Sequence, residues 1–285
     1  AAVPMIMGAN IGTTVTNTLV SLGHARRSDE FRRAFAAATM HDFFNVMAVA
    51  IFLPIEIVTG VFSRSATWLA TTLAGGNDLG GTFKSPVKGA VKWLAQGLQA
   101  PAEAFTDNTT VLGVLFLVLG IALIFFTLTF ITKNMRLLVV SRIEHSLNAA
   151  LQKSGIVGIA IGIVVTIAVQ SSSITTSILI PLVGSGILAV RSAYPITLGA
   201  NVGTTITALL AATAAGEVSG LSIALVHTLF NLVAIAAVYP FASIRYLPVR
   251  GAEWLASMVV ERKAVAVVYV VGLFFIVPIV GILVL

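Results

Sequence analysis

Three short polar runs interrupt an otherwise apolar sequence, and their side chains are the ones that could bind ions. Residues 8–16 read GANIGTTVT, and residues 199–207 repeat this motif as GANVGTTIT with two Ile/Val exchanges. Residues 170–177 read QSSSITTS, in which seven of the eight side chains are hydroxyls or amides. Each unsatisfied polar group is costly in hydrocarbon, so these side chains must face protein, water or a bound ligand.

The QSSS run is typical of the tip of a helical hairpin that binds an anion. It divides residues 155–190 into two arms that are each too short to cross a bilayer, which predicts a hairpin that enters and leaves on one side. The second arm then begins at the tip, where its first backbone N–H groups lack intrahelical partners and carry the positive end of the helix dipole. Ser171, Ser172 and Ser173 add hydroxyl groups, so we expect an anion here.

The duplicated GAN motif has two interpretations. Two glycines four residues apart, with an asparagine between them, predict a broken helix whose free carbonyls and threonine hydroxyls suit a small cation such as sodium. The pairs Gly8–Gly12 and Gly199–Gly203 also fit the GxxxG pattern of closely packed membrane helices. Because the whole pattern recurs beside a polar hairpin tip, we favour a binding site.

A second duplicated element carries histidine and asparagine. HDFFN at residues 41–45 corresponds to HTLFN at residues 227–231, so each copy has a histidine (His41 and His227) followed four residues later by an asparagine. Such residues in a membrane helix brace a buried network or relay protons, and their duplication favours bracing. Asp42 has no acidic counterpart, and a buried carboxylate needs a cation or a partner. Ion coordination and a hydrogen bond to histidine both stay open for Asp42.

Composition predicts that membrane helices hold these motifs. Hydrophobic residues make up 58% of the 285-residue chain, and mean hydropathy is +1.01. Charged residues make up 10%, against about 25% in a typical soluble domain. Residues 111–131 and 264–285 each form an uncharged run that is long enough to cross a bilayer. We therefore expect an all-α membrane protein.

Charge and cysteine content argue against other classes of protein. The net charge of +6 comes from basic residues in short connectors between apolar runs, as in cytoplasmic loops. A basic stripe with interleaved aromatic residues, which would bind nucleic acid, is missing from the sequence. The sequence has no cysteine, which excludes disulfides and thiol chemistry, and it has no cluster of metal-ligating residues.

The basic connectors predict that the two GAN segments cross the membrane in opposite directions. The connector at residues 24–33 carries four arginines, which places it in the cytoplasm, so the first GAN segment runs inward. Arg191 precedes the second GAN segment and Glu217 follows it in a connector without Lys or Arg, so this segment runs outward. Inverted copies typically build one transport site from two halves near the membrane centre.

The predicted organisation has five parts. They are a first repeat (1–62), an extracellular loop (63–110), a connecting transmembrane helix with a cytoplasmic helix (111–153), a second repeat with the QSSS hairpin (154–250), and a cytoplasmic connector with a C-terminal transmembrane helix (251–285). The chain begins without an initiator Met or a signal-peptide pattern, so we interpret it as a fragment.

In this order the motifs resemble those of the type II sodium-coupled phosphate cotransporters. The resemblance rests on QSSSITTS, on GANIGTTVTNTLVSLGH with FRRAFAAATMHDFFN, and on AYPITLGANVGTTITALLAA with HTLFN. It implies an inverted-repeat secondary transporter with a re-entrant helical hairpin and broken transmembrane helices, which imports inorganic phosphate with sodium by alternating access. It implies no enzyme activity and no organic cofactor. It also implies two QSSS hairpins, and the 191-residue offset between the GAN motifs would place the first one upstream of residue 1, so we expect a fragment that lacks the first hairpin. The lack of cysteine favours a bacterial member, in a multi-pass arrangement in the inner membrane.

The resemblance also implies a set of site residues. Phosphate contacts are expected from Ser171, Ser172, Ser173, Asn10 and Asn201. Sodium contacts are expected from Gln170, Ser171, Thr204, Thr205, Thr207, Thr13, Thr14, Thr16 and Asp42. Expected partners are phosphate, sodium and membrane lipid, without nucleic acid, and a homo-oligomer stays open.

Three other activities stay open on the sequence. A sodium-coupled carrier could take another oxyanion, such as sulfate or a dicarboxylate, although neither motif holds an Arg or Lys to bind a carboxylate. A membrane-embedded serine hydrolase with His227 as base would need one reactive serine and one oriented histidine. The sequence instead has a cluster of serines and a duplicated histidine. Broken helices also line passive channels.

Overall fold

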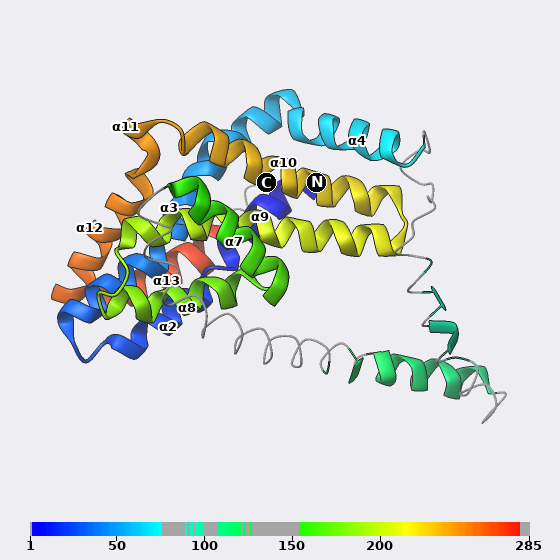
Figure 1. The fold of residues 1–285 in the computed structure, drawn as a ribbon, viewed down its shortest axis with the longest axis horizontal. Coiled ribbons are helices and arrows are strands. Elements are labelled where there is room, and N and C mark those ends of the chain that lie inside the picture. Colours follow the sequence, from blue (N-terminus) through cyan, green and yellow to red (C-terminus); the bar gives the residue numbers. More distant parts are fainter. Residues whose placement is uncertain are drawn as a thin grey trace.

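The computed structural model describes residues 2–75, 108–120 and 154–279, together with residues 89, 92, 93, 95–97, 99, 122, 123 and 126. Every regular element in these residues is a helix, which confirms the predicted all-α class (Figure 1). Three helices are long and apolar enough to cross a membrane: Ser28–Thr59, Val190–Ala215 and Val218–Val238. The helix predicted at 111–131 is described without a gap only to residue 120, and the one predicted within 132–153 lies outside the described residues.

The first GAN motif lies in two short helices. Helix α1 spans Ala2–Gly12 and α2 spans Val15–Ser21, with a turn at Thr13 and Thr14 between them. A 3-10 turn at Leu22–His24 then leads through the basic connector into the long helix α3, Ser28–Thr59. Acidic residues in the first turn of α3 stabilise the positive end of its helix dipole.

Helix α4, Val61–Leu73, follows α3 after a sharp turn. Gly60 makes this turn with φ of 62°, a conformation that glycine adopts without steric cost. Glu56 caps α4, because its carboxylate accepts the backbone N–H groups of Phe62 and Ser63 at 2.7 and 3.2 Å. The predicted start of the loop at residue 63 is therefore wrong, since residues 63–73 continue as helix.

The QSSS run forms the turn of a helical hairpin, as predicted. Helix α7 spans Gly155–Val169 and α8 spans Ser172–Gly184. Between them Gln170 has φ of 56°, which is uncommon outside glycine and turns the chain back. Ser171 is extended and caps α8, because its Oγ accepts the N–H of Ile174 at 3.3 Å. The depth of this hairpin in a membrane stays a prediction.

The second GAN motif lies inside one uninterrupted helix, α9, Val190–Ala215. The prediction of a broken helix is therefore wrong for this copy. The reason is packing, because a Cβ on Gly199 would lie 2.0 Å from the carbonyl oxygen of Ile159 in α7. A Cβ on Gly203 would lie 2.6 Å from the Cβ of Thr166 in the same helix. These glycines allow α7 and α9 to pack closely, as the GxxxG alternative predicted.

The remaining helices follow α9 in sequence. They are α10 (Val218–Val238), α11 (Ala242–Arg245), α12 (Leu247–Glu261) and α13 (Ala264–Val271), and α13 continues into a π-helical turn at Gly272–Ile276. Helix α12 occupies most of the stretch that we expected to be a connector, and it packs against α3. The expected C-terminal helix begins at Ala264 and is described to residue 279.

Helix α3 lies at the centre of the described bundle. It contacts α1, α2, α8, α9, α10 and α12, so its side chains meet both GAN segments and the hairpin. Phe44 of α3 is fully buried and packs edge-on against the fully buried Tyr194 of α9, with ring centroids 6.3 Å apart. This packing places the HDFFN side chains of α3 between α1 and α9.

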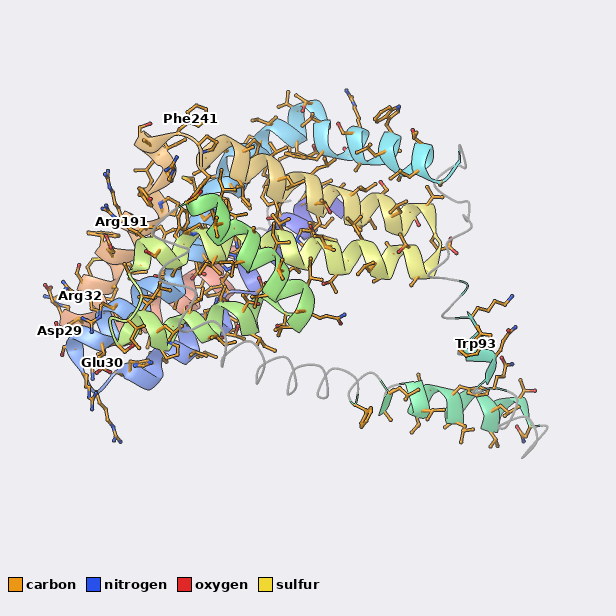
Figure 2. The ribbon with its side chains drawn as sticks, viewed as in Figure 1. Asp29, Glu30, Arg32, Trp93, Arg191 and Phe241 are labelled. Atoms are coloured by element: carbon orange, nitrogen blue, oxygen red, sulfur yellow. The ribbon has the colours of Figure 1, made fainter. Side chains whose placement is uncertain are left out.

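Charged side chains gather at one end of the bundle. Figure 2 shows Asp29, Glu30 and Arg32 at the start of α3 near the same end as Arg191 at the start of α9 (left in this view). The chain leaves α2 toward this end and enters α9 from it, so the two GAN segments lead in opposite directions relative to it.

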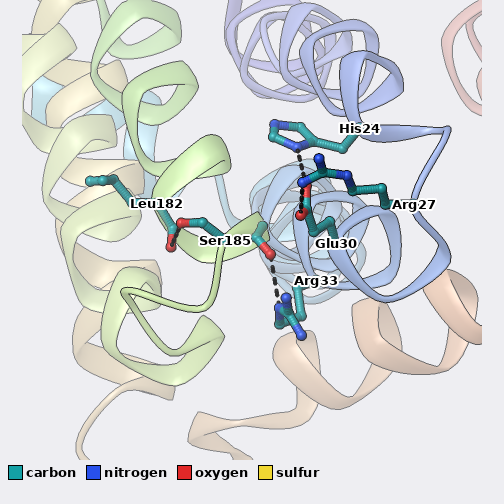
Figure 3. A network of polar contacts seen from close by, with 7 residues as sticks. His24, Arg27, Glu30, Arg33, Leu182 and Ser185 are labelled. Atoms are coloured by element: carbon teal, nitrogen blue, oxygen red, sulfur yellow. Dashed lines mark hydrogen bonds and ion pairs between the residues drawn. The ribbon is translucent and has the colours of Figure 1, made fainter.

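The basic connector also contacts the base of the hairpin. The Nε of Arg33 donates a hydrogen bond of 2.9 Å to the carbonyl oxygen of Gly184, where α8 ends (Figure 3). Beside it, Arg27 forms a 2.7 Å ion pair with Glu30, and His24 lies 3.6 Å from the same carboxylate. A cationic side chain is favourable at the C-terminal end of a helix, so Arg33 holds the hairpin base against the start of α3.

Candidate functional site

The hairpin tip meets the first GAN motif where that motif is interrupted. The Oγ of Ser173 donates a hydrogen bond of 3.1 Å to the carbonyl oxygen of Thr13, 160 residues earlier in the sequence. Thr13 lies in the turn between α1 and α2, and it is exposed. Two of the segments that the sequence singled out therefore come together in space, and both carry polar groups at this point.

A buried asparagine ties α2 to α8 beside this contact. The Oδ1 of Asn17 accepts hydrogen bonds from the hydroxyls of Thr176 at 2.9 Å and Ser177 at 3.2 Å. Asn17 is 1% exposed, and the sequence analysis did not single it out. The available signal was an amide in the apolar run after the first motif, where the second motif has Ala208 instead.

The start of α8 presents polar groups at the tip. Gln170 is exposed, Ser171 and Ser173 are half-buried, and Ser172 is 8% exposed. The first backbone N–H groups of a helix have no intrahelical acceptor, and here only that of Ile174 is capped by a side chain among the described residues. The tip therefore offers N–H donors, hydroxyls and a helix N-terminus, the combination that binds anions.

The asparagines of the two GAN motifs each bind the histidine helix of the opposite copy. Asn201 accepts from the Nε2 of His41 at 2.6 Å and donates to the Oδ1 of Asn45 at 2.9 Å. Because the amide nitrogen of Asn201 is used as a donor, its oxygen is the acceptor, which requires the Nε2-protonated tautomer of His41. His41 and Asn45 of α3 therefore both bind the side chain of Asn201 in α9.

The same pattern recurs with the copies exchanged. Asn10 accepts from the Nε2 of His227 at 2.8 Å and donates to the Oδ1 of Asn231 at 3.1 Å. We call the six residues of both clusters the cross-copy network: Asn10, His41, Asn45, Asn201, His227 and Asn231. Bracing by the duplicated histidines, as the sequence favoured, is the arrangement in the structure.

One difference separates the two halves of the cross-copy network. The amide nitrogen of Asn45 donates to the backbone carbonyl of Asn10 at 2.7 Å. The corresponding nitrogen of Asn231 is buried and has no hydrogen-bond partner within the described chain. Asn10 is thus hydrogen-bonded by residues of both copies, whereas the side chain of Asn201 is hydrogen-bonded by α3 alone among the described residues.

The predicted sodium threonines direct their hydroxyls to their own helices. Each hydroxyl donates to a backbone carbonyl three or four residues earlier: Thr13, Thr14, Thr16, Thr204, Thr205 and Thr207. Such a hydroxyl keeps oxygen lone pairs that can bind a cation. Across residues 154–279, no hydrogen bond joins Gln170 or Ser171 to Thr204 or Thr207. The predicted roles of these residues with sodium stay predictions.

Asp42 is fully buried next to the cross-copy network. Its Oδ2 accepts a 2.6 Å hydrogen bond from the hydroxyl of Tyr269 in α13, whereas its Oδ1 has no partner in the described residues. The neighbouring His41 binds Asn201 instead, so the hydrogen bond between Asp42 and histidine that the sequence left open is not the one formed. The partner is Tyr269, which the sequence analysis did not identify.

Comparisons with known proteins agree with the motifs. The profile of the Na+/Pi-cotransporter family matches residues 123–245. The sodium-dependent phosphate transport proteins 2B of Bos taurus and of Homo sapiens are each 31% identical over 98% of this chain and 52% of their own length. Protein 2A of Mus musculus is 31% identical over 98% of this chain and 54% of its own length. The chain thus spans about half the length of these relatives, and no solved structure matches it.

Proposed function

We propose that the chain imports inorganic phosphate together with sodium across a cell membrane, because part of it matches the Na+/Pi-cotransporter family and the relatives named above are sodium-dependent phosphate transport proteins. The observation that carries this proposal is the hydrogen bond from Ser173 at the hairpin tip to Thr13 at the turn of the first GAN motif. It brings an anion-binding helix start next to an interrupted helix with free oxygen atoms. The family is one of transporters rather than enzymes, which argues against a serine hydrolase.

The phosphate binds at the start of α8. The hydroxyls of Ser171 and Ser172 and the first backbone N–H groups of α8 donate to its oxygens. The hydroxyl of Ser173 joins them when its hydrogen bond to the carbonyl of Thr13 is exchanged for one to phosphate. No basic side chain lies in the QSSS run, so the protein supplies partial charges in place of a full positive charge.

Sodium binds with phosphate because the site alone cannot balance the charge of the anion. One helix start contributes roughly half a positive charge, and a phosphate dianion carries two negative charges. Sodium ions near Gln170, Ser171 and the threonines of the two GAN motifs would supply the remainder. If one net positive charge crosses in each cycle, about 2.3 kcal/mol per 100 mV of membrane potential drives uptake.

Asn10 and Asn201 serve mainly to hold the two copies together in this proposal. Both side-chain amides already make hydrogen bonds within the cross-copy network. A phosphate contact by either residue would require these bonds to be exchanged during transport. The opposite directions of the two GAN segments support an inverted repeat, in which one half moves against the other to give alternating access.

Uptake into proteoliposomes tests the proposal. Purified protein should accumulate radiolabelled phosphate against its gradient when the sodium concentration is higher outside. This uptake should stop when choline replaces sodium. Ser173→Ala should slow uptake about tenfold or more, because it removes a tip hydroxyl. Ser257→Ala is the matched control, since Ser257 is equally half-buried but lies on α12.

Three outcomes would reject the proposal. Phosphate uptake that ignores the sodium gradient would exclude sodium coupling. If sulfate or succinate inhibits the uptake of radiolabelled phosphate at a lower concentration than unlabelled phosphate does, another oxyanion is the substrate. Equilibration without accumulation would indicate a passive channel.

A further inference from the structure

Asp42 needs a structural explanation, because it is a carboxylate in the middle of an apolar helix. Its exposure is 0%, and no basic side chain lies within ion-pair distance of it in the described residues. Burial of an ionised carboxylate is costly unless hydrogen bonds or a cation compensate the charge. The question is therefore which groups hold Asp42, and what remains for a cation to bind.

Tyr269 holds one oxygen of this carboxylate from a distant part of the sequence. It lies on α13, 227 residues after Asp42, and its hydroxyl donates to Oδ2 at 2.6 Å. The ring of Tyr269 packs edge-on against Phe35 of α3 and Phe274 of the π-helical turn, with centroids 6.4 and 6.3 Å apart. Two aromatic contacts thus fix the ring, so that its hydroxyl points at the carboxylate.

The other oxygen of Asp42 is left to bind something else. Oδ1 is buried and has no hydrogen-bond partner in the described chain, and the side chain of Thr14 lies next to the carboxylate. The Thr14 hydroxyl donates to the carbonyl of Ile11 at 2.6 Å, so its oxygen lone pairs stay available. A carboxylate oxygen and a hydroxyl oxygen beside it, both buried, suit a monovalent cation.

We propose that Tyr269 is a positioning residue for co-transported sodium, which holds Oδ2 of Asp42 so that Oδ1 is presented to the ion. This inference rests on the proposed function, because it concerns the sodium that accompanies phosphate. Tyr269 does not touch the ion itself. It fixes the rotamer of Asp42, and it couples α13 to α3 at the level of the first GAN motif.

Tyr269→Phe tests the inference with the smallest possible change. It removes the hydroxyl and keeps the ring that packs on Phe35 and Phe274. The half-saturating sodium concentration for phosphate uptake should rise about tenfold, the change expected when a hydrogen bond to a charged group is lost. The maximal rate and the KM for phosphate at saturating sodium should stay within about twofold of the unmodified protein.

Tyr194→Phe is the matched control. Tyr194 is a fully buried tyrosine on α9 whose hydroxyl has no hydrogen-bond partner among the described residues, so its loss removes no bond. Its sodium dependence should therefore be unchanged. In an Asp42→Asn background, Tyr269→Phe should have no further effect, because both changes act on one sodium site.

The inference is overturned if Tyr269→Phe leaves the sodium dependence unchanged or shifts it no more than Tyr194→Phe does. It is equally overturned if Tyr269→Phe and Asp42→Asn have fully additive effects, or if the change falls on the KM for phosphate. Each of these results would limit Tyr269 to a packing role.

A binding measurement separates this inference from the proposed function. The melting temperature of purified protein is followed without phosphate while sodium chloride replaces choline chloride at constant ionic strength. Sodium should raise the melting temperature of the unmodified protein, and Tyr269→Phe should need about tenfold more sodium for the same rise. If this shift occurs in a protein that transports no phosphate, the proposed function fails while the role of Tyr269 stands. If sodium stabilises neither protein, the role of Tyr269 fails.

Discussion

Asn10 and Asn201 illustrate how a polar side chain is accommodated in an apolar interior. Each is at most 5% exposed, and each uses both its amide oxygen and its amide nitrogen. The partners come from the opposite copy in both cases. These hydrogen bonds lower the free-energy cost of burying the polar groups. They also make each residue depend on the other, because removal of one partner leaves the other buried without a hydrogen bond.

The reciprocal pairing leads to a prediction for single residues. Asn201→Ala should lower the melting temperature of the purified protein, because it leaves the Nε2 of His41 and the Oδ1 of Asn45 unsatisfied. Each unsatisfied buried group costs about 1–3 kcal/mol. His41→Ala in the Asn201→Ala background should then cost less than it does alone, with a coupling energy of about 1 kcal/mol in a double-mutant cycle of melting data.

The crossed pair provides the control for this cycle. Asn201 makes no hydrogen bond with His227, whose partner is Asn10. The effects of Asn201→Ala and His227→Ala should therefore add. Equal coupling in both cycles would mean that the histidines act through general packing and would contradict specific pairing.

At the residue scale, the sequence predicted which side chains matter better than it predicted their partners. The duplicated histidines and asparagines were visible because they repeat with the same spacing. Asn17 and Tyr269 have no counterpart in the other copy, so the repeat did not mark them. The bond between Tyr269 and Asp42 joins positions 227 residues apart, and only the packing of α13 on α3 reveals it.

The two GAN motifs show how context decides whether a helix is broken. Both have the same glycines, yet α9 continues through its motif and the first copy turns at Thr13 and Thr14. In α9, a Cβ added to Gly199 or Gly203 would lie closer to atoms of α7 than van der Waals contact allows. A Cβ added to Gly8 or Gly12 would meet no described atom within 4 Å. Close packing against a neighbour thus accompanies the straight helix.

This contact leads to a prediction for the α7–α9 pair. Gly199→Ala should destabilise the protein by about 1–3 kcal/mol or force the two helices apart, because its Cβ would lie 2.0 Å from a backbone oxygen that cannot move alone. Gly220→Ala on α10 is the control, since a Cβ there meets nothing within 4 Å and alanine favours the helix. The measurement is the melting temperature of each variant in detergent, and equal stability of the two variants would contradict the close contact.

Helices α4 and α12 were missed for an identifiable reason. Phe62, Ala66 and Ala70 are buried along α4, and their spacing of four residues is an amphipathic helix signal that was present in the sequence. The glycine-rich stretch that follows, GGNDLGG, made the whole region resemble a loop. Helix α12 has a similar buried face, but its glutamates and arginine suggested a connector between membrane spans.

At the scale of the whole molecule, charge defines one end. Arg191 is exposed near this end, and so is Arg27, which forms an ion pair with Glu30 there. Glu217 is exposed beyond the opposite end of α9, so a spanning α9 places Arg191 and Glu217 on different sides of the membrane. The sequence placed the arginine-rich end in the cytoplasm because basic loops are retained there.

Cysteine labelling tests this placement directly, because the 285 residues contain no cysteine to remove. Arg27→Cys and Arg191→Cys should resist an impermeant maleimide added to intact cells and should react after the membrane is opened. Glu217→Cys should react in intact cells. The unmodified protein is the control for background labelling. Reaction of Arg191→Cys and Glu217→Cys from the same side would contradict a membrane-spanning α9.

The arrangement of whole segments was the least accessible part of the prediction. Hydropathy and basic connectors predicted spans and directions, because these depend on local composition. Most contacts that assemble the candidate site, by contrast, join distant positions, for example 160 residues apart from Ser173 to Thr13 and 221 apart from Asn10 to Asn231. Sequence spacing carries no information on which copy contacts which.

The cross-copy network has a consequence for how this chain can change over time. The residue that complements each GAN asparagine belongs to the other half of the duplication. A mutation in one motif therefore cannot be compensated within its own half, and the two halves are not free to diverge separately. We expect substitutions at Asn201 in related proteins to be accompanied by changes at His41 or Asn45, and those at Asn10 by changes at His227 or Asn231.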